Sequence, residues 1–86
     1  MYYVYILKWE KRHYIGYTNN LERRMWEHGR KEVRTSRIIK VNKLLGYFEK
    51  ETEEESKKLE KMMKRDGHIR HWIGHSTFIK DEREIR

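Results

Sequence analysis

Two short runs of aromatic and β-branched residues near the N-terminus set the pattern for the rest of the chain. They cover residues 3–7 and 14–18, and six mostly polar residues separate them. Such residues favour strands, and the separation is too short for a helix, so the sequence predicts a β-hairpin. Because successive side chains alternate between the faces of a strand, Tyr3 and Tyr5 should share one face, opposite Val4.

A helix-start signal follows the hairpin directly. Asn19 with Glu22 three residues later forms a capping-box pattern, and Gly29 is a suitable helix stop. Leu21 and Met25 stand one turn apart, so they should face the sheet. The sequence therefore predicts a helix packed on the hairpin.

The second half repeats this order of strand and helix. Residues 43–49 are predicted to form a third strand, in which Gly46 indicates a bulge or a close approach. A second capping box at residues 52–55 begins a helix that runs to about Arg65 and stops near Gly67.

The C-terminal part has a weaker pattern. A short helix is expected over residues 69–73, and Phe78 and Ile79 should help to close the core. The charged residues 80–86 are expected to form an exposed turn or to fray. The whole chain is thus expected to be a single α+β domain over residues 1–86, with a small mixed sheet covered by helices.

Composition narrows the class of protein. The chain has 86 residues, enough for one domain, and no cysteine, which excludes a disulfide scaffold and a thiolate metal site. No apolar run reaches the length of a membrane span, and the N-terminus lacks an apolar signal region. We therefore expect a cytoplasmic protein without membrane contact.

The net charge of +7 is unevenly distributed. Residues 1–48 hold 11 Lys and Arg against 4 Glu, whereas residues 49–86 hold 10 of each sign. A one-sided basic surface favours nucleic acid as partner. The basic segment 30–43 is interpreted either as a phosphate-contacting arm or as a solvated loop. The candidate nucleic-acid-binding residues are Arg23, Arg30, Lys31, Arg34, Arg37, Lys40 and Lys43.

Several short motifs occur in a fixed order over residues 2–65. They are Val4-Tyr5-Ile6-Leu7, Tyr14-Ile15-Gly16, Thr18, Leu21, Arg24, His28, Glu60-Lys61 and Lys64. Together they resemble the GIY-YIG nuclease family, and in particular its small standalone members. The catalytic domains of the excision-repair nuclease and of homing endonucleases are similar. The resemblance implies a three-stranded antiparallel sheet flanked by helices, and hydrolysis of DNA phosphodiesters with Mg²⁺ or Mn²⁺.

The resemblance also implies roles for five residues. Tyr5 and Tyr14 stand at the two motif tyrosines, and Glu60 at the glutamate that holds the single metal. Arg24 matches a helix arginine that can fork onto phosphate oxygens. Tyr14 is the preferred general base and Tyr5 orients the water or the phosphate, although the two could exchange roles. His28 relays a proton, binds the phosphate, or simply packs at the helix end.

The chain departs from the family pattern at two positions. Tyr3 stands where the first motif begins with glycine. Tyr17 stands where some members carry a lysine directly after Tyr-Ile-Gly. A tyrosine acts as a base only when nearby cations favour its phenolate form. The neighbouring lysine that would do so is therefore missing.

Other interpretations remain open on sequence grounds. The chain could be a catalytically silent nucleic-acid-binding module that acts with a partner, although a carboxylate at Glu60 would then repel the phosphate. Glu60 could also be one half of a surface i,i+4 pair with Lys64. His68, His71 and His75 have the spacing of a zinc site on one helical face.

Association and substrate choice are the last open points. Trp9 and Trp26 are candidate anchors for a second subunit in a homodimer, or they complete the core. The chain has no room for an added DNA-selecting domain. We therefore expect weak sequence preference on double- or single-stranded DNA, or targeting through a partner.

Overall fold

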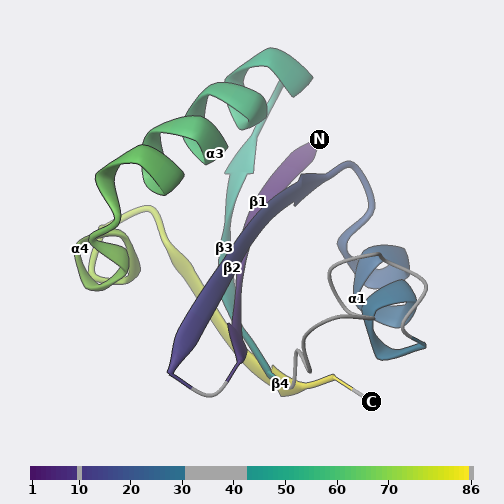
Figure 1. Ribbon diagram of the computed structural model, residues 1–86. Coiled ribbons are helices and arrows are strands. Elements are labelled where there is room, and N and C mark those ends of the chain that lie inside the picture. The colour runs from purple at the N-terminus through teal and green to yellow at the C-terminus, as the bar shows by residue number, and fades with distance from the viewer. Residues whose placement is uncertain (10, 31–42, 86) are drawn as a thin grey trace.

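A hairpin of two long strands begins the chain, and the other elements are built on it (Figure 1). The computed structural model describes residues 1–9, 11–30 and 43–85. In chain order the elements are β1 (Tyr2–Trp9), β2 (Arg12–Thr18), α1 (Leu21–Gly29), β3 (Lys43–Lys50), α3 (Glu53–Asp66), α4 (Ile69–Ile73) and β4 (Ile79–Glu84). The candidate DNA contacts Lys31, Arg34, Arg37 and Lys40 lie outside the described residues.

The strands form one sheet with the order β2-β1-β3-β4, and every neighbouring pair is antiparallel. The α+β class and the antiparallel sheet that the resemblance implied are confirmed, but the sheet has four strands rather than three and is not mixed. The fourth strand, β4, occupies the segment for which an exposed turn was predicted. It pairs with β3, and its Arg83 also pairs with Glu22 of α1 at 2.8 Å.

The two faces of the sheet carry separate cores, as the alternation in β1 predicted. Helix α1 covers one face, and α3 with α4 covers the other (Figure 1). The first core consists of Tyr5, Leu7, Leu21, Met25 and Leu44. The second consists of Val4, Ile6, Ile15, Phe48 and Met63, with Phe78 packed against it.

The predicted N-cap residue is correct for α3 and wrong by one residue for α1. The Thr52 side chain accepts from the Glu55 amide at 3.2 Å, which confirms the second capping box. Helix α1 is capped by Asn20, whose side chain accepts from the Arg23 amide at 3.1 Å, so the prediction of Asn19 is wrong by one residue. The Thr18 hydroxyl accepts from the Asn20 amide at 3.1 Å and thereby fixes the chain just before the helix.

Gly46 marks both features that the sequence indicated, a bulge and a close approach. The register of β3 shifts on both sides, between Leu44 and Gly46 against β4 and between Ile6 and Leu7 against β1. A side chain at Gly46 would collide with the Phe78 ring and with the Ile79 carbonyl. The bulge and the missing side chain therefore let β4 and Phe78 approach the sheet.

The three histidines of the proposed zinc site do not form one. Within the described parts of the chain, no group of three or more His, Asp or Glu side chains is placed to hold a metal ion. His68 precedes the first turn of α4, whereas His75 lies beyond its end, with Nδ1 2.9 Å from the Thr77 hydroxyl. Since α4 ends at Ile73, the helical spacing on which the prediction depended does not extend to His75.

Trp26 does not complete the core. Its side chain is 56% exposed on α1, with the Arg30 guanidinium 4.8 Å from its ring centroid. The use of Trp26 as an anchor for a second subunit stays a prediction. The described residues include no helix that is both long and apolar enough to cross a membrane.

Candidate active site

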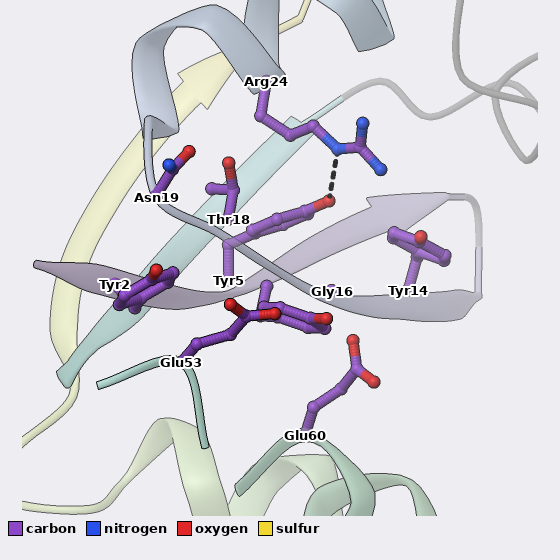
Figure 2. Close-up of a pocket in the computed structure, with 10 residues that line it drawn as sticks. Tyr2, Tyr5, Tyr14, Gly16, Thr18, Asn19, Arg24, Glu53 and Glu60 are labelled. Carbon is purple, nitrogen blue, oxygen red and sulfur yellow. Dashed lines mark hydrogen bonds between the residues drawn. The ribbon is translucent and has the colours of Figure 1, made fainter. Parts of the chain in front are cut away.

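An open pocket of about 410 Å³ runs along β2, the edge strand next to β1 (Figure 2). Helix α1 reaches it from one face of the sheet and α3 from the other. Its lining residues are Tyr2, Tyr5, Tyr14, Gly16, Tyr17, Thr18, Asn19, Arg24, Glu53 and Glu60. Four of the five predicted catalytic residues line this pocket, from four different elements, whereas His28 lies behind it.

Tyr5 lies at the centre of the site and is fully buried. Its hydroxyl oxygen accepts from Arg24 Nε at 3.3 Å (Figure 2). The same oxygen lies 3.2 Å from His28 Nε2, within hydrogen-bonding distance. Burial raises the pKa of Tyr5 above its usual value, despite the opposing effect of the Arg24 hydrogen bond. Tyr5 therefore stays protonated at neutral pH.

His28 is a buried partner of the two motif tyrosines. Only 2% of the residue is exposed, and its ring meets those of Tyr5 and Tyr14 edge-on, at centroid distances of 5.8 and 5.6 Å. Burial and the nearby charge of Arg24 lower the pKa of His28 to about 4. The imidazole is thus neutral at pH 7. His28 lies inside the core, near the end of α1.

Arg24 is held on two sides while its end faces the pocket (Figure 2). Tyr5 receives its Nε–H, and Glu27 Oε1 lies 3.6 Å from its Nη1. A guanidinium fixed in this way presents a positive charge to an incoming phosphate with little loss of side-chain entropy. The geometry therefore suits Arg24 to bind a phosphate oxygen.

Glu60 reaches the pocket from α3, on the side opposite Arg24 (Figure 2). Its Oε1 is 3.6 Å from Lys64 Nζ, so the predicted i,i+4 pair is confirmed. The pair is more than a surface contact, because the Glu60 side chain is only 17% exposed. Lys64 Nζ also lies 5.9 Å from the Tyr14 ring centroid. Lys64 therefore brings a positive charge close to both Glu60 and the Tyr14 ring.

A second carboxylate at the pocket, Glu53, was missed. The sequence analysis assigned it to the capping turn, but it lines the pocket and pairs with Lys57 at 3.1 Å. Lys57 Nζ in turn lies 6.0 Å from the Tyr17 ring centroid. The seven-residue spacing between Glu53 and Glu60 is a signal that could have found it, because it places both on one face of a helix.

The oxygen-rich lining fits a hard divalent cation. Mg²⁺ is usually held by one or two carboxylates together with waters and substrate phosphates, rather than by a full protein cage. Glu60 and Glu53 offer such carboxylates, and Thr18 and Asn19 line the same pocket from the side of α1 (Figure 2). The open pocket leaves room for waters and a phosphate.

The described candidate DNA contacts lie away from this pocket. Arg23 and Arg30 are exposed on α1, and Lys43 lies 3.8 Å from Glu82 of β4. None of the three is among the residues that line the pocket. The structure therefore does not bring them together with the catalytic candidates.

Gly16 makes the arrangement of the tyrosines possible, and we expect Gly16→Ala to disturb it. Gly16 faces Tyr5 across the β1–β2 pair, and a Cβ there would lie 2.5 Å from the Tyr5 hydroxyl and 3.1 Å from Tyr14 Cε1. Because Tyr5 is buried, its ring cannot simply move aside. Urea unfolding should show a loss of about 1–3 kcal/mol, the usual cost of overpacking.

Gly74→Ala is the matched control for this prediction. A Cβ at Gly74 would lie 3.4 Å from the nearest atom, the Arg70 carbonyl oxygen, which a small local shift accommodates. Its backbone is helical, so alanine fits there without strain. Equal stability of the two variants would show that the contact between Tyr5 and Gly16 is not tight in solution.

Comparison with known proteins places the chain in a family. A family model described as the GIY-YIG catalytic domain matches residues 1–69, which include the hairpin, α1, β3 and α3. No curated protein and no solved structure matches the chain. The matched segment contains every pocket residue, so the fold is of the nuclease type and the protein belongs to the GIY-YIG family.

Proposed function

We propose that this protein is a metal-dependent DNA endonuclease that hydrolyses phosphodiester bonds. The observation that carries the proposal is the meeting of Tyr14, Arg24 and Glu60 in one pocket, from three separate elements. These residues supply a proton acceptor, a phosphate-binding cation and a metal-binding carboxylate. Hydrolysis of a phosphodiester needs all three functions.

In this proposal Tyr14 accepts the proton of the attacking water. The water oxygen bonds to phosphorus while the bond from phosphorus to the 3′ oxygen breaks. The leaving 3′ oxygen takes up a proton from solvent, so the products carry a 5′-phosphate and a 3′-hydroxyl. Tyr5 is not the base, because burial raises its pKa and keeps its hydroxyl protonated. Tyr5 is instead a positioning residue that orients Arg24 toward the phosphate.

Glu60 would hold Mg²⁺ or Mn²⁺, together with waters and a substrate phosphate. When bound, the ion supplies Lewis-acid activation of the phosphate and stabilises the leaving oxygen. Arg24 opposes the negative charge that develops on the other phosphate oxygens. Lys64 contributes a further positive charge near Tyr14, with Nζ 5.9 Å from the ring centroid.

The second candidate is a DNA-binding module without activity. The observation that favours it is that both pocket carboxylates already face lysines, Glu53 with Lys57 and Glu60 with Lys64. Two neutralised carboxylates would repel a phosphate less than bare ones. On this alternative the pocket binds a phosphate but does not hydrolyse it.

Nicking of supercoiled plasmid distinguishes the two candidates. We expect nicked circles with MgCl₂ or MnCl₂ and intact plasmid when EDTA removes the metal. Labelled single strands assayed in parallel would show which form of DNA is preferred. Retarded plasmid in a gel-shift assay without nicking in either metal would identify the silent module.

A further inference from the structure

A second groove, of about 490 Å³, adjoins the candidate active site on the far side of Tyr14. It lies between the turn of the β1–β2 hairpin and the C-terminal end of α3. Tyr14 lines both the groove and the active-site pocket. Lys64 lines the groove and pairs with Glu60 of the pocket. A chain molecule bound in the pocket could therefore continue into the groove over Tyr14.

The two hollows differ in charge. Lys11, Arg12 and Lys64 line the groove and are exposed, and no Asp or Glu is found among its described lining residues. The pocket, by contrast, contains two carboxylates. The groove thus has the charge of a phosphate-binding surface, whereas the pocket has the composition of a metal-binding one.

The surroundings of His13 support this view. His13 lines the groove, and its strand partner is Lys8 of β1. Partial burial and the charge of Lys8 lower the pKa of His13. The imidazole is therefore uncharged in the free protein. A phosphate in the groove would stabilise its protonated form, which would add a further positive charge upon binding.

We propose that this groove binds backbone phosphates of the DNA strand whose scissile phosphate lies in the pocket. The proposal rests on the proposed function, since it extends the path of the same substrate. It assigns a DNA-binding role to part of the excess basic charge in residues 1–48, namely to Lys11 and Arg12 at the hairpin turn. The ring of Tyr14, between the two hollows, offers a face on which a sugar or base can stack.

The test compares DNA affinity after removal of two groove charges. The variant is Lys11→Gln with Arg12→Gln. The control is Lys58→Gln with Lys80→Gln, which removes the same charge from α3 and from β4, at the opposite edge of the sheet. Fluorescence anisotropy with a labelled oligonucleotide in EDTA, over a salt series, measures binding without cleavage.

We expect the groove variant to bind at least about ten-fold more weakly and to lose about one to two from its slope of log affinity against log salt. The control should lose much less of either. A charge-preserving variant, Lys11→Arg with Arg12→Lys, should bind like the wild type, which excludes damage to the hairpin. Wild-type affinity and slope in the groove variant, or an equal loss in the control, would overturn the proposal.

Measuring DNA binding and plasmid nicking separately distinguishes failure of the groove proposal from failure of the endonuclease proposal. If the protein nicks plasmid and the groove variant binds normally, the groove proposal fails and the proposed function stands. If the groove variant loses affinity while the wild type never nicks, the groove is supported and the endonuclease proposal fails. A wild type that binds no DNA in EDTA or in Ca²⁺ overturns the groove proposal directly.

Discussion

Replacement of Glu60 by Gln is expected to reduce metal-dependent plasmid nicking by about 10³-fold, because several kcal/mol of transition-state stabilisation depend on the metal. The amide keeps the size of the side chain but loses the charge that, in the proposed function, would hold the cation. Glu60 is the carboxylate that reaches from α3 toward Tyr14 and Arg24 (Figure 2). Initial rates of nicking with saturating MgCl₂ measure the effect.

The folded state should tolerate this change. The pair between Glu60 and Lys64 spans 3.6 Å, and its lysine is half exposed, so its loss costs at most about 1 kcal/mol. Glu53→Gln should lower nicking less, and Glu54→Gln, exposed on the same first turn and outside the pocket, should leave it unchanged. Wild-type nicking by Glu60→Gln would remove Glu60 from the metal site.

Replacement of Tyr14 by Phe is expected to lower kcat/KM for cleavage by about 10²–10⁴-fold, the usual contribution of a general base. Phenylalanine keeps the ring contacts with Tyr5 and His28, so packing is preserved. Initial rates of cleavage by the wild type and the variant, measured at the same metal concentration, test this expectation.

Two other tyrosines of the pocket serve as controls. Tyr17 lines the pocket and packs against the second core. Tyr17→Phe removes its hydroxyl and should leave the rate of cleavage nearly unchanged. Tyr5→Phe leaves Arg24 Nε and buried His28 Nε2 without the hydroxyl between them, so it should destabilise the fold by about 1–3 kcal/mol. It should slow cleavage less than Tyr14→Phe does, because Tyr5 positions Arg24 and is not the proposed proton acceptor. A larger loss of kcat/KM in Tyr5→Phe than in Tyr14→Phe would make Tyr5 the base.

The sequence by itself determined the features that depend on short spacing. Alternation in residues 3–7 predicted the two faces of β1, and the Thr52 capping box predicted the start of α3. The spacing from Tyr14 to Arg24 and the later Glu60 identified the family, which the match over residues 1–69 supports. Such features are visible in a sequence because neighbouring residues decide them.

The tertiary structure decided what depends on distant contacts. β4 is a strand because it pairs with β3, far from it in the chain, whereas its charged sequence alone predicts a turn. Only the packing of α3 beside the edge strand β2 places Lys64 next to Tyr14 and Glu53 in the pocket. The burial of His28 is a property of the assembled core as well. Residues far apart in the chain meet there, and no local pattern records which side chains face each other across elements.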